Sequence, residues 1–421
     1  MNYGIFTWGT RGDVQPFIPL ALGLMEQGEQ VTLFAPENFK TFIEGYGIIF
    51  SPLHGKVDEI LHSAEGLRVL KSGNTVTLLR LMRKEGKKIQ PLVNRDLLIG
   101  SGKVEVIITS VLCLVWISCI AEKLNKKWAV ITFSPPTTPT KEFPFAGFAF
   151  FNNAKFNWFS HWLFEYLYWT LNKKEINKFR QSISLPVLKS NILDRITVNN
   201  ILNLYAISPS LIPSPDDWPS NSGVTGYLSL PAKQRESHEI DKIPSELLEF
   251  LRKGEAPVYI GMGSMPIPNT DLLKNIISAL LASTEHRIIF CTGQSKISNL
   301  PQHNHLFVTD YTNHEWLLPQ CKVAIIHGGA GTIAAVLKAK VPMIIASIVA
   351  DQPWWGKIIQ DKSLGLHIPF KKLNSKRLIE LIDKVQSNQI KENLFTIGEK
   401  IIHENGAETA IGLIRKYFEM K

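Results

Sequence analysis

A glycine-rich turn near residue 330 has the composition of an anion-binding loop. Residues 327–332 read His-Gly-Gly-Ala-Gly-Thr and follow an apolar run, Val323–Ile326. This order predicts a buried strand, a tight turn and the start of a helix. Backbone N–H groups in such a turn approach an anion closely, and the helix adds a partial positive charge at its first turn. His327 and Thr332 can add side-chain donors, so the segment predicts a phosphate or pyrophosphate site.

A second polar motif lies in residues 351–356, which read Asp-Gln-Pro-Trp-Trp-Gly. Asp351 and Gln352 place a carboxylate beside an amide shortly after another apolar run. This pair suits vicinal hydroxyl groups, because a site built to bond a hydroxyl rejects analogues that lack it. The alternative is turn chemistry before a proline, where Asp is common. A phosphate loop followed by a hydroxyl-binding pair is what a nucleotide-sugar site requires.

Two other turns combine glycine with polar side chains. Asp13 ends the sequence Gly-Thr-Arg-Gly-Asp, between a short apolar strand and a helix. It can take a proton from an attacking hydroxyl, but an acid at a helix start also stabilises by about 1 kcal/mol, and the residues alone slightly favour that role. Gly263 and Ser264 suit a phosphate oxygen or a plain strand–turn–helix joint. Their spacing is not the G-x-G-x-x-G fingerprint, so it does not predict NAD.

Aromatic residues are crowded into residues 143–169. Several recur there at helical spacing, and this pattern favours a core helix. The alternatives are the wall of an apolar acceptor pocket or a patch that enters a membrane interface. The lysines nearby suit either an anionic surface or a solvated helix face. Trp316 stands apart from this segment and, on the residues alone, is best interpreted as a core residue.

The composition narrows the function classes. A chain of 421 residues with 45% apolar residues predicts two or three globular domains. Its net charge is +9, but it has no arginine-rich run and no zinc-finger spacing, so an anionic donor or an anionic membrane surface fits better than nucleic acid. The four cysteines form no C-x-x-C pair, and there is no D-x-D or His/Cys ligand spacing. We therefore expect free thiols, no metal and no cofactor.

The sequence predicts neither a signal peptide nor a membrane-spanning helix. Arg11 and Asp13 interrupt the first apolar stretch. The uncharged, strongly apolar run at residues 106–121 is shorter than the roughly 20 residues of a spanning helix and divides into a strand and a helix. We expect a cytoplasmic protein, with peripheral contact at the inner membrane face as an open alternative.

Strand and helix patterns alternate in both halves of the chain, which predicts an α/β fold of doubly wound parallel sheets. The predicted strands are residues 3–8, 31–35, 104–109, 128–133, 257–261, 287–292, 323–326 and 341–346. Proline, serine and glycine concentrate over residues 208–231, as in a linker. The predicted domains are residues 1–225, with a linker at about 208–240, residues 241–395, and a C-terminal helix over residues 396–421.

A series of short motifs, in order and across nearly the whole chain, matches one family. They are GTRGDVQP at 9–16, PENF at 36–39, VTGY at 224–227, GMGSMP at 261–266, HEWLLP at 314–319, and the motifs at 327–332 and 351–356. The chain resembles the UDP-glycosyltransferases of the GT-B fold, in particular the sterol glucosyltransferases. It is also similar to bacterial enzymes that glycosylate antibiotic aglycones.

The resemblance implies a fold and a set of roles. The fold is two Rossmann-like domains that face each other across a cleft, with the C-terminal helix packed back on the first domain. Asp13 would be the catalytic base, and Trp316 would stack on uracil. The implied donor site consists of Gly263, Ser264, Trp316, His327, Gly329, Ala330, Gly331, Thr332, Asp351 and Gln352. The acceptor side is predicted to include Arg11, Gly12, Phe143, Phe145, Trp162, Trp354 and Trp355.

The sequence departs from the family pattern at two positions. Ile326 stands where the family often has a second histidine, a conservative change if the side chain points into the sheet. Trp354 stands where the family has phenylalanine, which would reshape a pocket wall. The extra N-terminal membrane-binding domains of eukaryotic sterol enzymes have no counterpart here, which indicates a bacterial stand-alone enzyme.

The predicted activity is transfer of a hexose, glucose first, from a UDP-sugar to the hydroxyl of a hydrophobic acceptor. Sterols, triterpenes, polyphenols and antibiotic aglycones are the acceptor classes that we expect. The reaction would invert the anomeric configuration and need no metal. Two alternatives remain open: a nucleotide-sugar epimerase on the same fold, and a non-catalytic module that binds lipid or membrane.

Overall fold

The chain forms two compact units in the computed structural model, which describes residues 1–148, 151–230, 243–293, 295, 297 and 299–419. Unit 1 comprises Met1–Val57, Glu85–Leu230 and Glu404–Lys421, and unit 2 comprises Asp58–Lys84 and Pro231–His403. Neither unit is continuous in sequence. The linear pattern did not predict that Asp58–Lys84, from the N-terminal half, belongs to unit 2.

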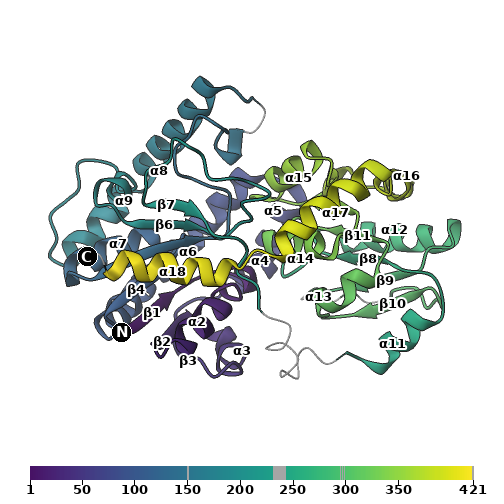
Figure 1. Ribbon diagram of the computed structural model, residues 1–421, viewed down its shortest axis with the longest axis horizontal. Helices are drawn as coiled ribbons and strands as arrows, with labels where there is room; N and C mark the ends of the chain where they lie inside the picture. The colour runs from purple at the N-terminus through teal and green to yellow at the C-terminus, as the bar shows by residue number, and fades with distance from the viewer. Residues whose placement is uncertain (149–150, 231–242, 294, 296, 298, 420–421) are drawn as a thin grey trace. The chain divides into compact units, whose positions relative to one another are not determined.

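Unit 1 is built on a parallel sheet of seven strands in the order β3-β2-β1-β4-β5-β6-β7 (Figure 1). In β1, Ile5 lies opposite Leu33 of β2 on one side and Ile108 of β4 on the other. The strands are β1 (Asn2–Phe6), β2 (Gln30–Pro36), β3 (Ile49–Leu53), β4 (Val106–Ser110), β5 (Lys127–Thr132), β6 (Leu202–Tyr205) and β7 (Ser222–Val224).

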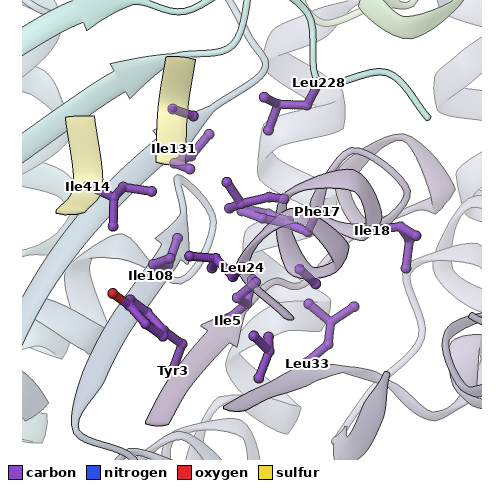
Figure 2. Close-up of a cluster of buried hydrophobic side chains, with 14 of the residues drawn as sticks. Tyr3, Ile5, Phe17, Ile18, Leu24, Leu33, Ile108, Ile131, Leu228 and Ile414 are labelled. Atoms are coloured by element: carbon purple, nitrogen blue, oxygen red, sulfur yellow. The ribbon is translucent and has the colours of Figure 1, made fainter. Parts of the chain in front are cut away.

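Side chains alternate across this sheet and form a core on each face. Ile5 points to one core, which also contains Phe17 of α2 (Phe17–Glu26) and Ile414 of α18 (Gly406–Glu419) (Figure 2). Phe6 points to the other core, which is covered by α6 (Thr75–Gly102), α7 (Leu114–Leu124) and α8 (Ala154–Ser182). The shorter helices of unit 1 are α1 (Arg11–Val14), η1 (Glu37–Phe39), α3 (Lys40–Glu44), η2 (Ala146–Phe148) and α9 (Asp194–Val198).

Unit 2 repeats the same topology with a six-stranded parallel sheet in the order β10-β9-β8-β11-β12-β13. The strands are β8 (Val258–Gly261), β9 (Ile288–Cys291), β10 (Leu306–Thr309), β11 (Val323–Ile326), β12 (Met343–Ser347) and β13 (Gly365–Pro369). Its helices are α4 (Val57–His62), α5 (Ala64–Ser72), the first part of α6, α11 (Ser245–Arg252), α12 (Thr270–Ser283), α13 (His314–Leu317), η4 (Leu318–Gln320), α14 (Ala330–Ala339), α15 (Gln352–Asp361), η5 (Phe370–Lys372), α16 (Ser375–Val385) and α17 (Asn388–Ile402).

Each sheet has one point where the strand order reverses. In unit 1 it lies between β1 and β4, and in unit 2 between β8 and β11. Open α/β sheets bind ligands at the carboxyl ends of the strands at such a point, because the loops on either side diverge there. We therefore expect ligands to bind at the loops that follow these four strands.

The α/β class and the parallel sheets are confirmed, and residues 106–121 divide into β4 and most of α7 as predicted. The boundary between the units, after Leu230, falls within the predicted linker, but the first part of that segment packs in unit 1, where Leu211 and Ile212 are buried and residues 222–224 form β7. The remainder of that linker, residues 231–240, lies outside the described residues. In the described part of the chain, no helix is long and apolar enough to cross a membrane.

The predicted C-terminal helix is two helices. The chain breaks between α17, which belongs to unit 2, and α18, which packs on α2 in unit 1. Gly406 opens α18 against Gly226, and a Cβ at Gly406 would lie 2.4 Å from the Gly226 carbonyl oxygen. This close approach of two backbones requires glycine at the start of the second helix.

Candidate functional site

The turn between β11 and α14 leaves backbone donors at the start of a ten-residue helix. Gly328 has φ +96°, a conformation that favours glycine, and a Cβ there would lie 2.7 Å from Ile345. Gly329 is the N-cap of α14. The first N–H groups of a helix have no partner within the helix, so those of Ala330, Gly331 and Thr332 point toward the region beyond β11.

His327, at the end of β11, is buried between two glycine turns. A Cβ on Gly263 would lie 2.4 Å from its Cε1 atom, and a Cβ on Gly329 would lie 2.6 Å from its Nε2 atom. Burial lowers the pKa of His327 to about 4, so the ring is neutral at pH 7. Its Nδ1 is buried and finds no hydrogen-bond partner among the described residues. Such an orphaned polar atom calls for a missing partner, and a ligand oxygen would supply one.

The turn after β8 provides the other side of this histidine site. Gly263 has φ +64°, and its carbonyl oxygen would lie 2.4 Å from a Cβ at Gly293 in the turn after β9. The backbone N–H of Ile267 donates to Oγ of Ser295 at 2.9 Å, which ties the two turns together. Ser264 is half-buried beside Gly263. The sheet thus brings the sequence-distant residues Gly263 and His327 together.

Asp351 and Gln352 open α15, but part of their hydrogen-bonding capacity is used locally. Asp351 Oδ2 accepts from the indole N–H of Trp355 at 2.9 Å, and burial raises the pKa of this carboxyl. Gln352 Oε1 accepts from the backbone N–H groups of Ile348 at 2.7 Å and Val349 at 3.2 Å. The Gln352 side chain therefore shapes its own loop with its oxygen and retains the amide N–H₂ as a donor.

Sequence reasoning missed Thr75, which supports the same loop. The backbone N–H of Ala350 donates to Thr75 Oγ1 at 3.2 Å across 275 positions of sequence. Ala350 has φ +61°, which strains a residue with a Cβ, so this bond helps to hold a strained residue directly before Asp351. No local pattern around Thr75 signals this contact, which depends on Asp58–Lys84 lying in unit 2.

Trp316 lies in α13, after the end of β10. The helix is capped by Asn313, whose side chain accepts from the N–H groups of Glu315 and Trp316. His314 Nε2 forms a 2.7 Å hydrogen bond with the buried Tyr259 hydroxyl of β8, which fixes the short helix to the sheet. Trp316 is half-buried, so part of its indole remains available for stacking.

Asp13 lies in the turn after β1 in unit 1, where its side chain closes the start of α1. Its Oδ2 accepts from the Thr10 N–H at 2.7 Å and from the Thr10 hydroxyl at 3.2 Å. A Cβ at Gly9 would lie 2.2 Å from that oxygen, so glycine is needed there. The helix-start role considered for Asp13 is therefore present. This role uses Oδ2 of the carboxylate.

Asp13 is at the switch point of the first sheet. Burial raises the pKa of Cys113, just after β4, to about 12, and the negative charge of Asp13 adds to that rise. Asp13 follows β1 and Cys113 follows β4, the two strands that flank the switch point. Arg11 lies over the ring of Phe42 at 4.7 Å and donates from Nε to Gln15 at 2.8 Å.

A histidine–carboxylate pair near the same turn was also missed. Trp8 Nε1 donates to the His54 carbonyl at 3.0 Å, so the end of β3 is held beside the turn after β1. His54 Nδ1 lies 2.5 Å from Asp96 Oδ2, and the His54 backbone N–H donates to the same oxygen at 3.0 Å. The 42 positions between the two residues gave no local signal for the pair.

The predicted acceptor-side residues are divided between the two units. Phe143 and Phe145 both contact the buried His161, and Phe145 stacks on Phe164 at 3.9 Å. Trp162 is 51% exposed on the outer face of α8. The exposed Gly12 lies in the Asp13 turn, whereas Trp354 and Trp355 are buried in α15 of unit 2. Trp355 therefore supports Asp351 and has no free face for a ligand.

Among the described residues, no group of three His, Cys, Asp or Glu side chains is placed to hold a metal ion. The cysteines Cys113, Cys119, Cys291 and Cys321 are buried free thiols. Ile326 is fully buried in β11, so its replacement of a family histidine is the conservative change expected. The chemistry available is backbone N–H groups, a neutral imidazole and two carboxylates, Asp13 in unit 1 and Asp351 in unit 2.

Two family models match the chain. The glycosyltransferase family 28 N-terminal domain matches residues 3–144, and the erythromycin biosynthesis protein CIII-like C-terminal domain matches residues 276–408. A sterol 3-beta-glucosyltransferase of Arabidopsis thaliana is 30% identical over 99% of this chain and 68% of the relative. One of Komagataella phaffii is 32% identical over 100% of this chain and 34% of the relative. The chain therefore spans about a third of the yeast protein, and these relatives give the expected bacterial origin no support.

Solved structures share the fold at low sequence identity. The glycotransferase of kitacinnamycin has a TM-score of 0.71 at 16% identity, covering 99% of this chain and 98% of that one. The glycosyltransferase VinC, solved in complex with dTDP, has a TM-score of 0.65 at 14% identity, covering 99% of both chains. These likenesses confirm the GT-B fold, and the 30% identity to the plant relative, over 99% of this chain and 68% of that relative, shows that the chain is a glycosyltransferase and belongs to the sterol 3-beta-glucosyltransferase family.

Proposed function

We propose that the protein transfers a hexose, glucose first, from a UDP-sugar to the hydroxyl of a hydrophobic acceptor, with sterols as the leading class. The observation that carries this proposal is the buried His327 with its orphaned Nδ1, set between two glycine turns at the switch point of unit 2. The names of the plant and yeast relatives support a sterol acceptor and glucose, and the dTDP complex of VinC supports a nucleoside diphosphate.

The donor half of the reaction follows from the groups around His327. The leaving diphosphate gains negative charge as the sugar departs, and fixed donors aimed at that charge stabilise the transition state. The start of α14 supplies backbone N–H groups, and the neutral imidazole supplies one N–H without carrying a charge of its own. Asp351 and the amide of Gln352 would bind sugar hydroxyls. No metal is needed in this scheme.

The acceptor half requires a base, and we assign this role to Asp13. Its carboxylate would take the proton of the acceptor hydroxyl as that oxygen forms a bond to the anomeric carbon. The bond from that carbon to the diphosphate oxygen breaks in the same step, and UDP leaves with the bonding electrons. A single displacement of this kind inverts the anomeric configuration. The Thr10 N–H holds one Asp13 oxygen, which would orient the carboxylate.

The decisive experiment follows UDP release and glycoside formation with UDP-glucose and cholesterol or ergosterol, in the presence and absence of EDTA. TDP-glucose and other UDP-hexoses serve as competing donors, and NMR of the product reports the anomeric configuration. We expect acceptor-dependent release that survives EDTA, and a β-glycoside from the α-linked donor. Donor turnover without any acceptor would instead favour the epimerase, and vesicle binding without turnover would favour the non-catalytic module.

Asp13→Asn separates the base from the helix start. Asparagine can still accept from the Thr10 N–H, so the cap is retained while the proton acceptor is lost. We expect kcat to fall by about 10²–10⁴-fold while the affinity for UDP is unchanged. Thr10→Val is the matched control, because it removes one donor to the carboxylate and leaves the base. An Asp13→Asn variant with full activity would show that this residue is only a cap.

We also propose a cellular location for the enzyme. We place the protein in the cytoplasm with peripheral contact at the inner membrane face, because a sterol acceptor resides in the bilayer. Fractionation of expressing cells, with and without a high-salt wash, tests this placement. Recovery in the supernatant under every condition would contradict it.

A further inference from the structure

The outer face of α8 carries a row of exposed aromatic and aliphatic side chains. Phe159 stacks on Trp162 with centroids 5.7 Å apart, and Trp162 stacks on Tyr166 at 5.5 Å. We call this row, with its neighbours, the α8 face: Trp158 at 48% exposure, Phe159 at 48%, Trp162 at 51%, Tyr166 at 54%, Leu167 at 44% and Leu171 at 55%. The four aromatic residues recur at three- and four-residue spacings and share one side of the helix, and Leu167 and Leu171 extend the apolar surface around it.

The opposite side of α8 fixes the orientation of this face. Asn157, His161 and Phe179 are buried there on unit 1. At the C-terminal end of the helix, the buried Arg180 donates to Glu122 through both terminal nitrogens, at 2.6 and 3.0 Å. Because the inner side is committed to packing and the end of the helix to this ion pair, the helix cannot rotate to hide the α8 face. The core-helix interpretation of the aromatic segment is therefore correct for the inner side only.

Positive charge borders the α8 face at both ends. Lys155 lies before it, and Lys173, Lys174 and Lys178 lie after it, all exposed. The helix contains two acids. Glu175 is bound by Lys87 at 2.9 Å, and burial raises the pKa of Glu165 to about 7, which weakens its negative charge at neutral pH.

We propose that the α8 face binds the interface of a bilayer that contains anionic lipid, with the aromatic rings among the lipids and the lysines on the headgroups. Trp and Tyr are favoured at this depth because their rings are apolar and their N–H or O–H groups still reach water. Each lysine near an anionic surface adds attraction that salt weakens. A second copy of the chain fits less well, because it would bring like-charged lysines together. The inference rests on the proposed function in one respect, since a bilayer is where a sterol acceptor would be found.

Vesicle sedimentation tests the proposal with the full chain. Vesicles of phosphatidylcholine alone are compared with vesicles that also contain phosphatidylserine, each at low and at physiological salt. We expect binding that increases with phosphatidylserine and a blue shift of tryptophan fluorescence on binding. Lys173→Glu/Lys174→Glu should abolish the preference for phosphatidylserine. Absence of wild-type binding to either vesicle would overturn the proposal.

The aromatic contribution is tested by Phe159→Ser/Tyr166→Ser, which should lower vesicle partition by about tenfold or more, since burial of even one aromatic side chain contributes about that factor. Val198→Ser is the matched control, because Val198 is 78% exposed on another helix of unit 1. Unchanged partition of the double variant would refute the proposal. If the wild-type protein does not bind vesicles but forms a dimer that is lost in the double variant, the face would instead be assigned to a second copy of the chain.

Activity assays separate this inference from the proposed function. With a water-soluble aglycone, Phe159→Ser/Tyr166→Ser should turn over donor at the wild-type rate, whereas with sterol embedded in vesicles it should be slower. Loss of activity with both acceptors would count against an interfacial role. If the wild-type protein binds vesicles but glycosylates nothing, the proposed function fails and the membrane inference stands.

Discussion

The buried imidazole of His327 should make unit 2 sensitive to acid. The folded state lowers the pKa of this histidine from its ordinary value of 6.5 to about 4 through burial. The folded protein therefore favours the neutral ring. The contribution of this preference to the free energy of unfolding is fully present above pH 6.5 and is lost as the pH falls toward 4. The difference of about 2.5 pH units corresponds to about 3 kcal/mol in total, of which about 2 kcal/mol is lost between pH 7 and pH 5.

His327→Gln removes this titration while keeping a side chain of similar size. Hydrogen–deuterium exchange of amides in β8 and β11 reports the opening of unit 2 separately from unit 1, which matters because two units need not unfold together. The quantity to compare is the change in opening free energy between pH 7 and pH 5. We expect the wild-type change to exceed that of His327→Gln by about 2 kcal/mol. The exposed His403→Gln, also in unit 2, should behave like the wild type.

An equal acid sensitivity in wild type and His327→Gln would refute the reasoning, because other titrating groups are common to both proteins. A bound nucleoside diphosphate adds a second readout. It would place negative charge beside the ring and raise the pKa of His327, so the acid sensitivity should shrink in its presence. No such effect on adding UDP would remove His327 from the donor site.

Thr75→Val should raise the donor KM by about fivefold with little change in kcat, because one hydrogen bond to the strained Ala350 is lost, while Thr75→Ser should restore wild-type KM. A KM that is unchanged in Thr75→Val would show that this threonine only stabilises the fold. Gly328→Ala should lower the free energy of unfolding of unit 2 by more than about 1 kcal/mol, since φ is +96° and a Cβ has no room. Gly331→Ala is its control, because nothing lies within 4 Å of a Cβ there and alanine favours the helix, so any loss of urea stability comparable to Gly328→Ala would contradict the argument.

The sequence predicted those features that depend on residues close together in the chain. The strand at Val323–Ile326, the turn from His327 and the helix after it occur as the pattern predicts. Gly263 and His327 were grouped only through the family resemblance, and their proximity in the structure agrees with a general property of parallel sheets, whose strand ends meet at one edge. The prediction of the strand, turn and helix required only periodicity and glycine placement.

Long-range partnerships were not readable. Nothing near Thr75 predicts its bond to Ala350, and nothing near His54 predicts its pairing with Asp96, because both contacts arise from tertiary packing. The edge strands β3 and β10 were missed although most of their residues are apolar, because runs of four or five residues are too short to show a clear period. The aromatic segment was ambiguous for a different reason: a helix that is apolar on two sides gives no period that distinguishes core from surface.

The allotment of Asp58–Lys84 to unit 2 has a practical consequence for recombining these enzymes. A chimera joined near residue 230 would take the loop of residues 350–352, which we propose binds the sugar, from one parent and its support by Thr75 from the other. The donor preference of such a hybrid would then depend on a loop and a support that come from different parents, and not on the grafted half alone. Grafts intended to exchange sugar specificity should therefore transfer residues 58–84 together with residues 231–403, as two insertions into a single recipient framework.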